Sequence, residues 1–202
     1  MNGGKGLYDD EINCLAERML KGTTTRWLGV YARDELPSEK ELLKQAQAKF
    51  GLPLPFALVF NNQPASEPGQ HWLAIFGMAA AAAGGGGGLH IEFFDCYALP
   101  PAAYSLHTDF KRIAHFSQRP LQSPSSALCG HYCLYFLFAR SRGYTFASII
   151  ARLAHHSVQP DKHVYLGVCK YITASTALLA PCNSPTRPNH HRQCSQIKCS
   201  FC

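Results

Sequence analysis

The sequence lacks a continuous apolar run of about 18 residues, the length that a membrane-spanning helix requires, so we expect no membrane span. Its first six residues, MNGGKG, lead into charged residues and lack the apolar core of a secretory signal. Both absences predict a protein that neither enters the secretory pathway nor crosses a membrane.

The cysteines do not form a recognisable disulfide framework. There are nine of them, an odd number, and several lie within apolar segments, as Cys14, Cys133 and Cys169 do. This distribution favours free thiols in a reducing, intracellular compartment.

The length of 202 residues suits one domain with a tail. We expect a domain over residues 1–180, interrupted by a low-complexity Ala/Gly loop at 79–88. The segment 181–202 is rich in Pro, Ser, Asn, Arg and Cys and predicts a disordered tail. The net charge of +6 permits contact with nucleic acid, but a solvated basic surface explains it equally well.

Hydrophobic periodicity and punctuation by Gly and Pro predict a mixture of helices and strands. A capping-box pattern, Ser38 to Glu41, opens one helix that Gly51 ends. We expect helices at 9–20, 38–50, 106–113, 128–140 and 145–155, and strands at 56–60, 71–78 and 89–95. Residues 163–172 fit a strand or a helix. The fold class that follows is α+β.

Cys129 is the candidate nucleophile. It follows a loop of small residues and begins a strongly apolar segment that predicts a buried helix. A helix N-terminus offers free backbone N–H groups and positive dipole potential, which together stabilise a thiolate. Thiol hydrolysis also needs a base, a group that orients the base, and donors for the developing oxyanion.

His71 and Asp95 are the candidate base and orienting acid. His71 opens one predicted strand, and Asp95 closes the next. If these strands pair as an antiparallel hairpin with His71 opposite Asp95, the turn centres on residue 83, inside the Ala/Gly run. The hairpin would then carry both side chains at one end and the low-complexity loop at the other.

Gln122 and the Cys129 backbone N–H are the candidate oxyanion donors, and Trp72 and Gly130 are expected to line the substrate cleft. Each residue also has an ordinary explanation: a cysteine before an apolar helix is usually part of the core, and a histidine at a strand end is usually structural. The order His, Asp, Gln, Cys at these element ends makes coincidence much less attractive than a Cys-His-Asp triad.

These residues resemble the adenovirus-type cysteine endopeptidases (adenain), especially their relatives in polinton (Maverick) transposons and large DNA viruses. The likeness covers roughly residues 7–155. It rests on WLGVY at 27–31, HW at 71–72, FFDCYALPP at 93–101 and QSPSSALCG at 122–130. The spacing from Gln122 to Cys129 matches the adenain pattern, whereas the acid is Asp95, as in the related SUMO-type proteases.

The resemblance implies a papain-like fold with a rearranged chain order, in which a central mixed or antiparallel sheet is flanked by helices. It implies cleavage of viral or transposon structural and capsid precursors, often next to Gly, in the host nucleus or virion. We expect the protein to be a monomer. No cofactor is implied, but adenain responds to an activating peptide and to DNA, so both are candidate partners beside the polyprotein substrate.

Two alternatives remain open. One is a SUMO- or ubiquitin-like-protein-specific protease of the same superfamily. The other is a non-catalytic protein that binds nucleic acid or zinc through the tail, which carries His190, His191 and four cysteines: Cys182, Cys194, Cys199 and Cys202. These cysteines include a single C-x-x-C pair rather than the two expected of a zinc module.

Overall fold

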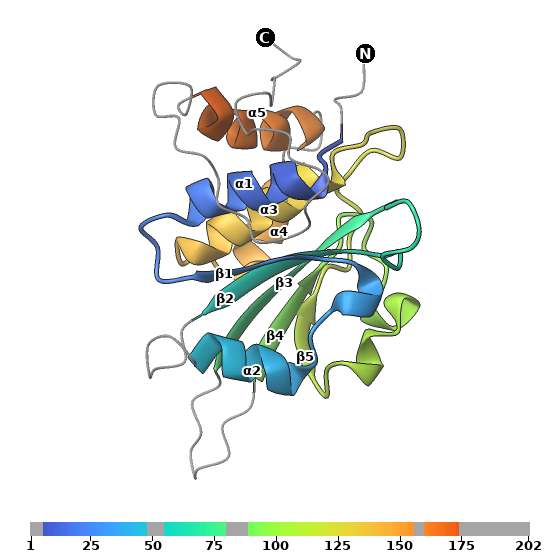
Figure 1. Ribbon diagram of the computed structural model, residues 1–202. Helices are drawn as coiled ribbons and strands as arrows, with labels where there is room; N and C mark the ends of the chain where they lie inside the picture. Colours follow the sequence, from blue (N-terminus) through green and yellow to red (C-terminus); the bar gives the residue numbers. More distant parts are fainter. Residues whose placement is uncertain (1–5, 48–54, 80–88, 156–159, 174–202) are drawn as a thin grey trace.

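The computed structural model describes residues 6–47, 55–79, 89–155 and 160–173. These residues fold into a five-stranded mixed sheet with helices on both faces (Figure 1). The strands are β1 (Arg26–Tyr31), β2 (Phe56–Asn61), β3 (Trp72–Ala79), β4 (Leu89–Phe94) and β5 (Ile113–Phe116), and they lie in chain order across the sheet. The two outer pairs are parallel and the two inner pairs antiparallel. The α-helices are α1 (Asp9–Leu20), α2 (Glu39–Gln47), α3 (Cys129–Ser141), α4 (Phe146–His155) and α5 (Pro160–Thr173).

Each face of the sheet buries its own apolar cluster. In β2, Ala57 and Val59 belong to the cluster shared with α1 and α3, whereas Phe56, Leu58 and Phe60 point to the opposite face, which α2 covers. Because both faces are covered, every side chain of β2 is buried and the strand is apolar throughout. The helix that begins at Cys129 is therefore held in the centre of one layer, between the sheet and α5.

Several predicted elements are confirmed. The first helix has the predicted bounds, 9–20. The capping box before α2 is formed, since the Ser38 backbone N–H donates to Glu41 Oε2 at 2.9 Å. Thr145 caps α4, its Oγ1 accepting from the Ser148 N–H at 3.2 Å. The predicted end of the second helix, at residue 50, lies outside the described residues.

The predicted helix at 106–113 is wrong. Leu106–Thr108 form one 3-10 turn, and Ile113 begins β5, where it pairs with Ile91 of β4. Leu106 and Phe110 are nevertheless buried, beneath the sheet rather than on one helix face. Their spacing satisfied the helical period, but strand pairing with a distant segment decided the local structure. The segment left open between strand and helix is helical, as α5.

The prediction of free thiols is also wrong for two of the cysteines. Cys14 in α1 and Cys169 in α5 are both disulfide-bonded, whereas Cys133 is free, as are Cys96 and Cys129. Of the predicted Ala/Gly loop, Ala79 is the last residue of β3, and residues 80–88 lie outside the described ranges, as does the predicted tail. No helix among the described residues is long and apolar enough to span a membrane.

Candidate active site

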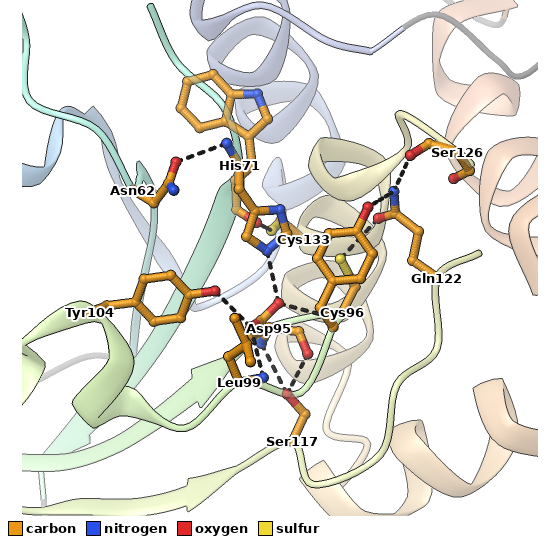
Figure 2. A network of polar contacts seen from close by, with 12 residues as sticks. Asn62, His71, Asp95, Cys96, Leu99, Tyr104, Ser117, Gln122, Ser126 and Cys133 are labelled. Carbon is orange, nitrogen blue, oxygen red and sulfur yellow. Dashed lines mark hydrogen bonds and ion pairs between the residues drawn. The ribbon is translucent and has the colours of Figure 1, made fainter. Parts of the chain in front are cut away.

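The side chains of His71 and Asp95 meet at one end of the β3–β4 hairpin. His71 Nε2 lies 2.8 Å from Asp95 Oδ1, and both residues are buried (Figure 2). The predicted antiparallel pairing is present, but its register differs from the prediction. Ala74 faces Phe94, which leaves Asp95 level with Leu73 instead of His71. The difference is two residues, so both side chains stay on the same face and meet along a diagonal.

Asp95 is held by a tight turn that follows β4. Its Oδ1 also accepts from the Tyr97 N–H at 2.8 Å, and its Oδ2 accepts from the Leu99 N–H and the Tyr104 hydroxyl, each at 2.9 Å. The turn places Ala98 in the left-handed region, at φ 62°. Four donors on a fully buried carboxylate leave it one orientation, which directs Oδ1 at His71.

The electrostatics of this pair favour its charged forms. Burial alone would lower the pKa of His71, but hydrogen bonds with Asp95 and Cys129 and the charges of both raise it to about 9. Burial alone would raise the pKa of Asp95, but hydrogen bonds from His71, Tyr97 and Tyr104 and the charge of His71 lower it. At neutral pH the site therefore holds an imidazolium beside a carboxylate.

Cys129 is the first residue of α3, as predicted, and its side chain reaches the imidazole of His71. The N-cap residue, Leu128, offers no side-chain cap to the helix. The backbone N–H groups of the first turn are therefore left for an anion, and the helix dipole points its positive end at the sulfur. Cys129 is 9 % exposed, so the thiol is sheltered yet reachable.

The Gln122 side chain lies close to the same group of residues. Its Nε2 donates to the Ser126 carbonyl at 2.7 Å and to the Tyr97 hydroxyl at 3.1 Å, and its Oε1 accepts from the Cys96 thiol at 2.9 Å (Figure 2). The backbone N–H of Gln122 also donates to the Cys96 carbonyl. Both donors of the Gln122 amide therefore already have acceptors, Ser126 and Tyr97.

The two predicted cleft residues, Trp72 and Gly130, lie against each other. The Trp72 indole N–H donates to the Leu7 carbonyl at 2.9 Å, which fixes the ring. A Cβ on Gly130 would lie 3.3 Å from Trp72 Cδ1 and 3.1 Å from Ile12 Cδ1. Glycine at position 130 thus lets α3 begin directly beneath the tryptophan, which is a packing role and places Cys129 near His71.

Sequence reasoning missed four residues that support the site. The Tyr97 ring stacks on His71, with centroids 4.8 Å apart. Ser117 brackets the Asp95 backbone, accepting from its N–H at 3.0 Å and donating to its carbonyl at 2.5 Å. Asn62 Oδ1 accepts from the His71 N–H at 2.9 Å, and Tyr104 binds Asp95 as above. Only Tyr97, two residues after the acid, carried a local signal; the other three come from separate elements.

Comparison with known proteins gives structural likeness alone. No family model matches the sequence, and no curated protein matches it. Among solved structures, the chain is similar to the central domain of an uncharacterized Legionella pneumophila protein, Lpg1148, with a TM-score of 0.52, 14 % identity, and coverage of 86 % of this chain and 99 % of that one. Together with the mixed sheet and the helix that begins at Cys129, this likeness confirms the predicted α+β fold class.

Weaker likenesses include two proteases. The ASFV pS273R protease has a TM-score of 0.46 and 17 % identity, over 72 % of this chain and 61 % of that one. The SUMO protease Ulp1 has a TM-score of 0.37 and 14 % identity, over 79 % of each chain. Neither likeness establishes the adenovirus-type resemblance, which remains a prediction.

Proposed function

We propose that this protein is a cysteine endopeptidase in which Cys129, His71 and Asp95 form the catalytic triad. One observation carries the proposal: the buried His71 imidazole lies 2.8 Å from Asp95 and interacts with Cys129, which begins a helix. A nucleophile, a base and an orienting group in this mutual arrangement define the site of thiol hydrolysis.

In the first half of the reaction, the Cys129 sulfur forms a bond to the scissile carbonyl carbon, and the carbonyl oxygen takes the electron pair. The N–H groups at the start of α3 and the Gln122 amide stabilise that oxyanion. As the carbon–nitrogen bond breaks, the His71 imidazolium gives its proton to the leaving amine. A thioester on Cys129 remains.

In the second half, the neutral His71 removes a proton from water, and the resulting hydroxide attacks the thioester carbonyl. The carbon–sulfur bond breaks, the acid product leaves, and the thiolate and imidazolium are restored. Asp95 keeps one tautomer of His71 throughout and balances its charge. No cofactor takes part in these steps.

The proposed substrates are structural or capsid precursors of a virus or transposon, cut near Gly in the host nucleus or virion. This part rests on the resemblance of the sequence motifs to adenovirus-type endopeptidases. The same resemblance supports activation by a short peptide or by DNA. The protein is proposed to act as a monomer. A ubiquitin-like-protein-specific protease is the competing assignment, and a panel of ubiquitin-like substrates separates the two.

Iodoacetamide labelling between pH 5 and 9, read by peptide mass spectrometry, tests the site without a substrate. Because a thiolate is the reactive form, Cys129 should alkylate at least about tenfold faster at pH 6 than Cys96 and Cys133. His71→Ala should abolish this advantage, and Cys129→Ala should abolish the labelled peptide. Equal rates at all three thiols, unchanged by His71→Ala, would refute the triad.

A further inference from the structure

A second cluster of metal-ligating side chains lies on the sheet, away from the proposed triad. His90 and Glu92 belong to β4 and His115 to β5, and one ligand atom from each lies within 4.8 Å of the other two. His90 and Glu92 are two residues apart on one strand, so they share a face. None of the three takes part in the proposed peptidase chemistry.

A β-bulge brings His115 into this cluster. The parallel register of β4 and β5 runs from the Ile91–Ile113 pair to the Glu92–His115 pair, so Ala114 is skipped. Without the extra residue, Ala114 would stand opposite Glu92. Bulges re-aim side chains next to functional sites, and this one sets an imidazole beside a buried carboxylate.

The distances suit one shared ion. His90 Nε2 lies 3.6 Å from Glu92 Oε1, close to the roughly 3.4 Å that separates two ligands about 2.1 Å from a tetrahedral zinc ion. The His90 and His115 rings are neighbours, with centroids 5.4 Å apart. His115 is exposed and Glu92 is 3 % exposed, so a solvent-accessible ligand can close on a fixed one.

Arg140 orients the carboxylate from behind. Its Nε and Nη2 donate to Glu92 Oε2 and Oε1, at 2.6 Å and 3.1 Å. The guanidinium also lies over the Phe76 ring, at 4.7 Å, and donates to the Tyr144 carbonyl. A ligating carboxylate ordinarily has such an outer partner, which holds it in one orientation. The arginine charge also lowers the affinity for a cation, so binding should be reversible rather than permanent.

We infer that His90, Glu92 and His115 form a binding site for one divalent transition-metal ion of the zinc type. Two imidazoles and one carboxylate are ligands that zinc prefers, and three protein ligands leave a fourth position for water. The ion ties the short edge strand β5 to β4. Both strands then lead into the Asp95–Ser117 contact, three residues after Glu92 and two after His115.

The test uses the full chain with Cys129→Ala, which removes the reactive thiol as a competing ligand. Zinc bound after equilibrium dialysis is compared in this parent and in His90→Ala, His115→Ala and His115→Gln versions of it. His155→Ala, an exposed histidine at the end of α4, is the matched control. Zinc held by other groups, such as the tail cysteines, is common to all and cancels in the difference.

Each of the three variants should bind one zinc equivalent fewer than the parent, and His155→Ala should bind the same number. Zinc at about 100 times its Kd should raise the melting temperature of the parent by roughly 5–10 °C, and this rise should disappear in the three variants. Equal stoichiometry and equal shifts in parent and variants would overturn the site. Circular dichroism checks that each variant is folded, which His115→Gln should be because position 115 is exposed.

Discussion

His71 and Asp95 meet along a diagonal of the β3–β4 hairpin, with Nε2 of the histidine 2.8 Å from Oδ1 of the aspartate. The contact is buried, and the carboxylate receives three further donors from its own turn and from Tyr104. Asp95 therefore holds the His71 imidazole in one orientation before any substrate binds.

Asp95→Asn should lower peptidase activity about 10²–10⁴-fold. The amide N–H₂ group would face N–H and O–H donors from which the carboxylate now accepts, and the positive charge of the imidazolium would lose its negative partner.

The His71 imidazolium is lost as the pH rises through about 9, so activity should fall on that alkaline side. In Asp95→Asn the alkaline limb should move to lower pH, since the aspartate is one of the groups that raise the pKa of His71. Profiles of kcat/KM against pH measure this, with the exposed Glu67→Gln as control. An unmoved limb would contradict the ion pair.

Gln122→Ala should reduce peptide hydrolysis about 10²–10³-fold, while iodoacetamide labelling of Cys129 changes by less than about threefold. Alkylation forms no oxyanion, so it does not need the amide donor, whereas acyl transfer does. Gln45→Ala is the control, at a glutamine in α2, which covers the sheet face opposite α3. Parallel loss of labelling and hydrolysis would mean that Gln122 acts by holding the fold instead.

Gly130→Ala should slow the labelling of Cys129 by about tenfold or more. The added methyl would press on Ile12 and Trp72 and displace the start of α3 from His71. Gly167→Ala, in α5, is a matched control, because its methyl would lie 3.2 Å from the Tyr135 ring, six residues after the thiol in α3. Each substitution replaces a helical glycine with alanine, so the two variants gain similar helix propensity. Equal labelling rates of Cys129 in the two variants would show that crowding at position 130 does not displace the thiol.

His131→Leu should remove part of the acid sensitivity of the fold. His131 is buried, its Nδ1 has no hydrogen-bond partner within the described structure, and burial lowers its pKa to about 4. An unfolded histidine titrates near 6.5, so the unfolded chain binds the extra proton between pH 6.5 and 4. The wild type should lose about 3 kcal/mol of unfolding free energy across this window through His131 alone.

Urea unfolding at pH 7, 6, 5 and 4 gives the free energy of unfolding of wild type and of His131→Leu. The contribution of His131 is the change with pH in the difference between these two free energies. Gln118→Leu, at an exposed residue that does not titrate, should leave the pH dependence of stability unchanged. If wild type and His131→Leu lose stability in parallel, His131 is not the group responsible.

Local patterns were sufficient where one chemical signal dominates its neighbourhood. The helix at 9–20 and the capping residues Ser38 and Thr145 behave as predicted, because amphipathic periodicity and capping act within a few residues. The start of the helix at Cys129 was equally predictable, since a loop of small residues is followed there by a continuous apolar run.

Long-range pairing set the limits of sequence reasoning. Ile113 joined a strand because Ile91 was available across the chain, and the hairpin register moved by two residues from the predicted one. The shift leaves His71 and Asp95 on the same face of the sheet, because a two-residue shift in a strand preserves the side to which each side chain points. The disulfide-bonded state of Cys14 and Cys169 depends on the packing of helices, which composition does not encode.

The sequence by itself determined which chemistry was available: a thiol before an apolar helix, a histidine and an aspartate at neighbouring strand ends, and an amide upstream. Only the tertiary structure decided how these groups are oriented and charged. Orientation comes from Asn62, Tyr97, Tyr104 and Ser117, which reach His71 and Asp95 from different elements. Their effect requires burial and hydrogen bonds at near 3 Å, and such distances exist only once the chain is folded.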